Sequence, residues 1–149
     1  MFKLAMALFA WCLLSITASA QSNKTNAINE LTGEMLECSV YYIISANCIE
    51  GHPDPDAPGL VKTYKGLAND IATLAMSTGK SVGVSDDAVN ARLSLITKNL
   101  MDSIANKCVM INVLFDRYDN FCKQLVGNVD ARLKELLAGK KCSGIYRCK

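Results

Sequence analysis

Six cysteines follow a predicted secretion signal in this chain, and together they limit the folds that it can adopt. An even number of cysteines in an oxidising compartment indicates a disulfide framework that staples a small domain. We therefore expect three disulfides and no free thiol in the mature chain. The expected disulfide-bonded residues are Cys38, Cys48, Cys108, Cys122, Cys142 and Cys148.

Residues 1–20 have the three parts of a signal peptide. Lys3 supplies a positive start, an apolar stretch runs from Leu4 to Thr17, and Ala18-Ser19-Ala20 provides the small residues that a signal peptidase requires. The apolar stretch is too short to span a bilayer, which needs ~20 residues. Residues 21–149 are then expected to form a single helical domain with a disulfide-tied C-terminal tail and no transmembrane segment. The expected location is secreted, or periplasmic if the cell is bacterial.

Apolar residues recur at intervals of three and four along most of the chain, which is the period of an amphipathic α-helix. The first helix is expected over about 26–49, and its broad apolar face predicts a central position. Prolines and glycines over 51–59 should end it. A second helix is expected over 60–78, with Gly79 as its C-terminal stop. Its predicted inward face consists of Leu60, Tyr64, Leu67, Ile71, Leu74 and Ala75.

Helical spacing then continues over 89–125 without a proline or glycine. This pattern fits either one very long helix or two helices that meet at a bend, for which Asn106-Lys107 is the weakest point. A last short helix is expected over 129–138, with Asn128 as its cap and Gly139 as its stop. No segment alternates with the period of a β-strand. The predicted fold class is therefore all-α, a disulfide-stapled helical bundle of three to five helices.

Helix geometry restricts how the cysteines can pair. Cys38 and Cys48 lie on one predicted helix, roughly 15 Å apart at 1.5 Å of rise per residue, which exceeds the reach of a disulfide. An up-down-up arrangement would bring Cys48 level with Cys108, and a bend in the long segment would return Cys122 toward Cys38. Six cysteines allow many pairings. The preferred set is Cys48–Cys108, Cys38–Cys122 and Cys142–Cys148.

Two short motifs suggest a metal or nucleotide site, and both have simpler interpretations. His52, Asp54 and Asp56 offer metal ligands in one loop, but a zinc site needs three or four convergent ligands, so a solvated loop is preferred. Gly79-Lys80-Ser81 matches the end of a phosphate-binding loop without its first glycine or a preceding strand, so a helix C-terminus is preferred.

Catalytic residues are also scarce in this sequence. The pairs Glu34–Glu37 and Asp116–Asp119 each share a helix face, where two carboxylates could act as acid and base. Exposed helices commonly carry such pairs. The chain has a single histidine, and every mature cysteine is expected in a disulfide, so no activated nucleophile is predicted. We therefore expect a protein that is not an enzyme, with no catalytic residue, no cofactor and no metal.

Three segments of the chain resemble small secreted helical proteins of alphaproteobacteria. They are the segments 85–92, 106–108 and 117–123. Those proteins are uncharacterised, so the resemblance implies a bacterial periplasm but no activity, fold or ligand.

Two classes of function fit these features. The first is a protein-interaction module of the cell envelope, of inhibitor, immunity or assembly-factor type, whose partner is unknown. The alternative is a carrier of a small apolar ligand in the helical core. Its cavity would be lined by Tyr41, Tyr42, Ile43, Ile44, Met76, Met101 and Met110, although core packing explains the same residues.

The C-terminal segment is the most basic part of the chain, and two cysteines are expected to hold its end in place. A clustered positive field attracts anionic surfaces and is screened by salt. We expect this segment to face an acidic protein or an anionic envelope component. Nucleic acid is not an expected partner, because few aromatic residues lie among the basic residues of the segment. The candidate partner-binding residues are Lys140, Lys141, Arg147 and Lys149, and Arg132 and Lys134 belong to the same basic cluster.

Overall fold

The computed structural model describes residues 2–51 and 53–140, with side chains described from Gln21 onward. These residues form five α-helices and one short 3-10 helix, with no strand among them, which confirms the all-α prediction. In chain order they are α1 (Phe2–Ile49), α2 (Ala57–Lys80), α3 (Asp86–Ser103), η1 (Cys108–Met110), α4 (Asn112–Gly127) and α5 (Val129–Leu137).

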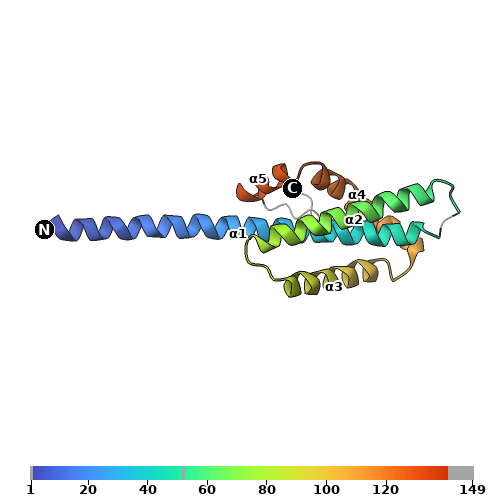
Figure 1. The fold of residues 1–149 in the computed structure, drawn as a ribbon, viewed down its shortest axis with the longest axis horizontal. Helices are drawn as coiled ribbons and strands as arrows, with labels where there is room; N and C mark the ends of the chain where they lie inside the picture. The colour runs from blue at the N-terminus through green and yellow to red at the C-terminus, as the bar shows by residue number, and fades with distance from the viewer. Residues whose placement is uncertain (1, 52, 141–149) are drawn as a thin grey trace.

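The C-terminal half of α1 is the axis of the bundle. It contacts each of the other α-helices, and its side chains are buried on almost every side between Ala27 and Ala46. Figure 1 shows α2 antiparallel to α1, with α3 on one side and the α4–α5 pair on the other. A helix that is apolar around its whole circumference is stable only when other elements surround it.

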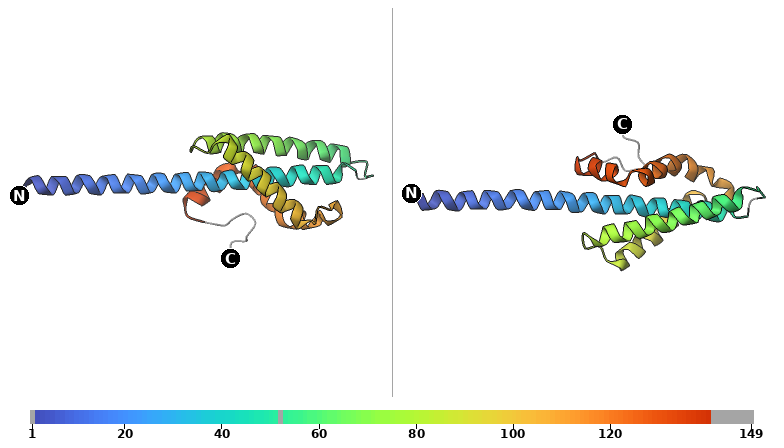
Figure 2. Two further views of the ribbon diagram at one scale, coloured as in Figure 1. Left: turned by 90° about the horizontal axis from the view of Figure 1, so that it is seen from below. Right: turned by 45° about the horizontal axis from the view of Figure 1, so that its top comes forward.

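The N-terminal half of α1 extends beyond the packed body (Figures 1 and 2). The expectation of a helix that begins near residue 26 was wrong, because α1 is continuous from Phe2. No proline or glycine separates the predicted signal peptide from the core, and helix propagation adds one hydrogen bond for each further residue. Ala27 is the first buried residue among those whose side chains are described.

The inward face of α2 agrees only in part with the predicted one. Leu60 and Leu74 were expected to face the core, but both are exposed. Ile71 and Ala75 are buried as predicted, and Tyr64 and Leu67 are partly buried against the core. The buried residues of α2 also include Val61, Ala68 and Gly79. A Cβ atom at Gly79 would lie 3.2 Å from Thr32 Cγ2, so small residues permit a close approach of α2 to α1. Periodicity alone favoured the large leucines, whereas close helix packing selected the small residues.

Gly79 is therefore a close-packing residue, which corrects its predicted role as the stop of the second helix. The left-handed position that ends α2 is Gly83, with φ of 85°. Ser85 then caps α3 by accepting a hydrogen bond from the Ala88 N–H, and Asp86 and Asp87 lie in the first turn. Acidic side chains there interact favourably with the positive end of the helix.

The long apolar segment is divided into α3 and α4, which settles the alternative that the sequence left open. The break includes Ala105 and Asn106, with φ values of 50° and 55°, close to the expected weak point. Downstream, the Asn128 side chain caps α5 by accepting a hydrogen bond from the Ala131 N–H, and Gly139 ends this helix with φ of 74°. Both predicted roles at α5 are confirmed.

Two disulfides join α1 to the second half of the chain, with the pairing that helix geometry predicted. Cys38 is bonded to Cys122 of α4, and Cys48 is bonded to Cys108 at the start of η1. These bridges span 84 and 60 residues, and loops of such length stabilise a fold by about 4 kcal/mol each in the chain-entropy account. The predicted Cys142–Cys148 pair lies outside the described residues.

Candidate functional site

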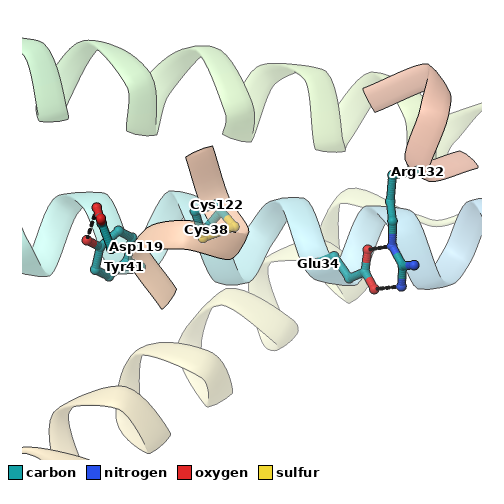
Figure 3. Close-up of a disulfide and its surroundings, with 6 residues drawn as sticks. All are labelled: Glu34, Cys38, Tyr41, Asp119, Cys122 and Arg132. Atoms are coloured by element: carbon teal, nitrogen blue, oxygen red, sulfur yellow. Dashed lines mark hydrogen bonds and ion pairs between the residues drawn. A yellow bond between two sulfur atoms is a disulfide. The ribbon is translucent and has the colours of Figure 1, made fainter. Parts of the chain in front are cut away.

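Three cross-links follow one another along the face of α1 that meets α4 and α5 (Figure 3). Glu34, Cys38 and Tyr41 lie on this face at the spacing of one helix side. Their partners are Arg132 of α5 and Cys122 and Asp119 of α4. We call this set the clamp face, because each pair ties α1 to the α4–α5 pair.

Glu34 and Arg132 form a buried, bidentate ion pair. Arg132 Nε donates to Glu34 Oε2 at 2.8 Å, and Arg132 Nη2 donates to Glu34 Oε1 at 2.5 Å. The two side chains are only 8% and 6% exposed. Arg132 Nη1 also donates to Glu135 at 3.1 Å. The hydrogen bonding of Arg132 to the Glu34 carboxylate is the main reason that the pKa of Arg132 is raised, so this arginine stays charged in the protein interior.

This ion pair corrects the grouping of Arg132 with the basic C-terminal surface. Counting charges along the sequence shows that the C-terminal segment is basic. It does not show that one of its arginines points inward and pairs with a glutamate 98 residues earlier. Its spacing on α5 relative to Leu133 and Leu136 gives a weak signal for burial, because all three lie near the apolar side of the helix.

Glu37 lies beside Glu34 and is half-buried. Burial and, to a smaller extent, the neighbouring charge of Glu34 raise its pKa from 4.5 to about 7, against the opposing effect of Arg117. A carboxyl group with a pKa near neutrality is a common feature of functional sites, although structural ion pairs produce it as well. Glu34 of the predicted carboxylate pair thus neutralises Arg132, whereas the raised pKa of Glu37 allows this carboxyl group to exchange a proton near neutral pH.

An aromatic cluster surrounds the other end of the clamp face. Tyr41 stacks on Tyr118 with 5.8 Å between ring centroids, and its edge meets Phe115 at 6.2 Å. Its hydroxyl donates to Asp119 at 3.2 Å, and Lys123 Nζ donates to the second oxygen of Asp119 at 2.7 Å. Burial and the nearby negative charge raise the pKa of Tyr41, so its phenol remains neutral. Asp119 of the Asp116–Asp119 pair therefore links α4 to α1 through this hydrogen bond.

A second feature lies at the end of the body where α1 stops. A hollow of about 610 Å³ is lined by both charged and apolar side chains, and Lys65 forms an ion pair with Glu50 there at 2.9 Å. The lining residues are Glu50, Pro53, Asp54, Ala57, Pro58, Val61, Lys62 and Lys65. Such a mixed, open lining suits the side chains of a protein partner better than a buried apolar ligand.

The metal interpretation of this loop receives no support from the described residues. Asp54 accepts a hydrogen bond from the Asp56 N–H at 2.9 Å, which is a local turn contact. His52 lies outside the described residues. Over residues 21–51 and 53–140, no three histidine, cysteine or acidic side chains are placed to hold a metal ion.

Apolar side chains are exposed at the same end of the body, on η1 and the start of α4. Val109 is 81% exposed, and Met110 and Val113 are also exposed. The Cys48–Cys108 bridge ties this segment to the end of α1. We refer to Val109, Met110 and Val113, together with the hollow, as the distal end; Figure 2 shows η1 and the α1–α2 loop at this end in both views.

The residues proposed to line a carrier cavity are mostly part of the packed core. Tyr41, Tyr42 and Ile44 are buried, and Ile43, Met76 and Met101 pack against the core. Met110 is exposed on η1. Of the candidate partner-binding residues, Lys140 is exposed just after α5. Lys141, Arg147 and Lys149 lie outside the described residues.

Comparison with protein-family models, curated proteins and solved structures finds no match to this chain. The resemblance to small secreted alphaproteobacterial proteins therefore stays a prediction. Among residues 21–51 and 53–140, no helix has the length and apolarity that a membrane crossing requires.

Proposed function

We propose that this protein is a secreted or periplasmic protein-interaction module of inhibitor, immunity or assembly-factor type, and that its distal end contacts the partner. The observation that carries the proposal is the exposure of Val109, Met110 and Val113 on a segment covalently fixed to α1. Single exposed apolar residues are ordinary, but three within one short segment that a disulfide ties to α1 can together bury apolar area on a partner.

The hollow at the same end of the body supports this proposal. Pro53, Pro58 and Val61 contribute apolar groups to its lining, while Lys62 and the Glu50–Lys65 pair contribute polar groups. Protein interfaces commonly combine an apolar centre with a polar rim.

The proposed compartment is supported by the arrangement of α1. Its N-terminal half lies outside the packed body, and the first buried side chain described is Ala27 (Figure 1). The predicted cleavage after Ala20 would therefore fall in the part of α1 that extends beyond the packed body (Figure 1). The two long-range disulfides suit an oxidising compartment.

Site-specific photocrosslinking in the producing cell tests the proposal. A photoreactive amino acid at Met110 should give a discrete crosslinked product that mass spectrometry assigns to one protein. Leu74 on α2 is the matched control, because the two side chains are 45% and 42% exposed. Identical products from both positions, or none from Met110, would exclude the distal end as the recognition surface.

The basic tail is proposed to assist by attracting an anionic partner or envelope surface. Glutamine at Lys140, Lys141, Arg147 and Lys149 should weaken binding to vesicles containing an anionic phospholipid, and most strongly at low salt. The variant should keep the circular dichroism spectrum of the parent. Equal binding of both proteins across a salt series would leave the tail without a role in recognition.

A further inference from the structure

The two described disulfides differ sharply in accessibility. Cys38 and Cys122 are completely buried within the clamp face. Cys108, by contrast, is exposed, Cys48 is half-buried, and the neighbouring Val109 is among the most exposed apolar residues described. A thiolate must reach a disulfide sulfur to exchange with it, so access alone strongly favours the Cys48–Cys108 bridge.

The backbone just before Cys108 is strained. The Asn106 N–H donates to the Met101 carbonyl and the Ala105 N–H donates to the Asp102 carbonyl, which is the hydrogen-bond pattern of a Schellman C-cap. The left-handed position of this motif normally belongs to glycine, as it does at Gly139 after α5. Here Ala105 occupies it, and Asn106 is left-handed as well, with φ of 50° and 55°. Surrounding constraints must hold these two residues in place.

Those constraints are few. Ile104 is completely buried on one side of the segment, and Leu114 is completely buried on the other. No residue of η1 is buried between them. Residues 105–110 are exposed, so the Cys48–Cys108 bridge is their covalent attachment to α1, and Ile111 packs against the core directly after them.

We propose that Cys48–Cys108 is a thiol-exchange site, which a protein dithiol of the C-x-x-C class opens while Cys38–Cys122 remains closed. The first thiolate of the dithiol attacks Cys108 Sγ, the bond between the two protein sulfurs breaks, and its electron pair and a proton go to Cys48. The second thiol then attacks the mixed disulfide, and Cys108 is released as a thiol. The dithiol leaves as a disulfide, so two electrons and two protons have passed to this protein. Lys107 directly precedes Cys108, and its positive charge favours the approach of the attacking thiolate.

Opening this bridge frees the segment that carries Val109 and Met110. The exchange reaction does not rest on the proposed recognition function, because it depends only on access to the sulfur and on the strained turn. If the distal end does bind a partner, the same reaction would change the shape of that surface.

Timed reduction of the purified, oxidised protein tests the proposal. The protein is incubated without denaturant with a thioredoxin-class dithiol, quenched with N-ethylmaleimide and mapped by peptide mass spectrometry, which separates the four cysteines from Cys142 and Cys148. Cys48 and Cys108 should be labelled at least about tenfold faster than Cys38 and Cys122. Equal rates, or no labelling of Cys48 and Cys108 before denaturant is added, would overturn the proposal.

Hydrogen exchange then separates local opening from unfolding. A Cys48→Ser/Cys108→Ser variant should exchange faster over residues 104–112, while residues 31–46 retain the protection of the parent protein. The matched variant Cys38→Ser/Cys122→Ser should lose protection in α1 and α4 instead. A loss of protection across the whole chain in the first variant would show that the exposed bridge is a structural staple and would contradict the proposal.

Discussion

Replacing Glu37 with glutamine should remove a pH-dependent loss of stability. Burial, followed by the charge of Glu34, raises the pKa of Glu37 from 4.5 to about 7, against the opposing effect of Arg117. At a pH between these two pKa values, Glu37 holds a proton in the folded protein that it has released in the unfolded chain. The contribution of Glu37 to the free energy of unfolding therefore decreases as the pH rises through this interval, and it is constant above the folded-state pKa.

The size of the effect follows from the same pKa change. A pKa raised from 4.5 to about 7 corresponds to a full linkage of about 3 kcal/mol. Because Glu37 is only half-buried, solvent screening reduces this to about 1–2 kcal/mol. Glu37→Gln should accordingly be more stable than the parent by about 1–2 kcal/mol at about pH 8 and of similar stability at about pH 5.

Urea unfolding followed by circular dichroism, with the disulfides intact and the ionic strength constant, measures this difference. Asp70→Asn is the matched control, because Asp70 is an exposed carboxylate on α2, away from the clamp face. This control should keep the pH profile of the parent. Parallel profiles for the parent and Glu37→Gln would refute the assignment of the pH dependence to Glu37.

Three further substitutions test the packing. Arg132→Met should lower the free energy of unfolding by about 3–5 kcal/mol, because it leaves the buried Glu34 charge unpaired. A second substitution, Glu34→Leu, should recover most of this loss. A cost below about 1 kcal/mol for the single variant would contradict the buried pair. Ala105→Gly should raise stability by about 1 kcal/mol in thermal unfolding, because glycine adopts the positive φ without strain; unchanged stability would argue against a left-handed residue there. Ser45→Ala should be neutral or stabilising by up to about 1 kcal/mol, because Ser45 Oγ is buried without a hydrogen-bond partner among the described residues; clear destabilisation in urea would reveal an unrecognised partner.

Local chemistry and helix period were readable from the sequence. The intervals between apolar residues predicted an all-α fold, Asn128 and Gly139 marked the ends of α5, and the reach of a disulfide excluded a Cys38–Cys48 bridge. These features depend on residues close together along the chain or on fixed covalent distances. They do not require knowledge of which helix faces which.

Only the tertiary structure decided how the helix faces are used. Gly79 serves close packing against Thr32 because α2 approaches α1 so closely, and the sequence pattern could not distinguish that role from a helix stop. Arg132 is buried because α5 folds back onto Glu34, a contact between residues far apart in the chain that charge counting cannot anticipate. The exposed Cys48–Cys108 bridge and the buried Cys38–Cys122 bridge both begin at a cysteine of α1. The two bridges differ in exposure because α4 covers Cys38, whereas no residue of η1 is buried at the other bridge. The burial of a side chain depends on which parts of the chain pack against it, and residue type alone does not determine this.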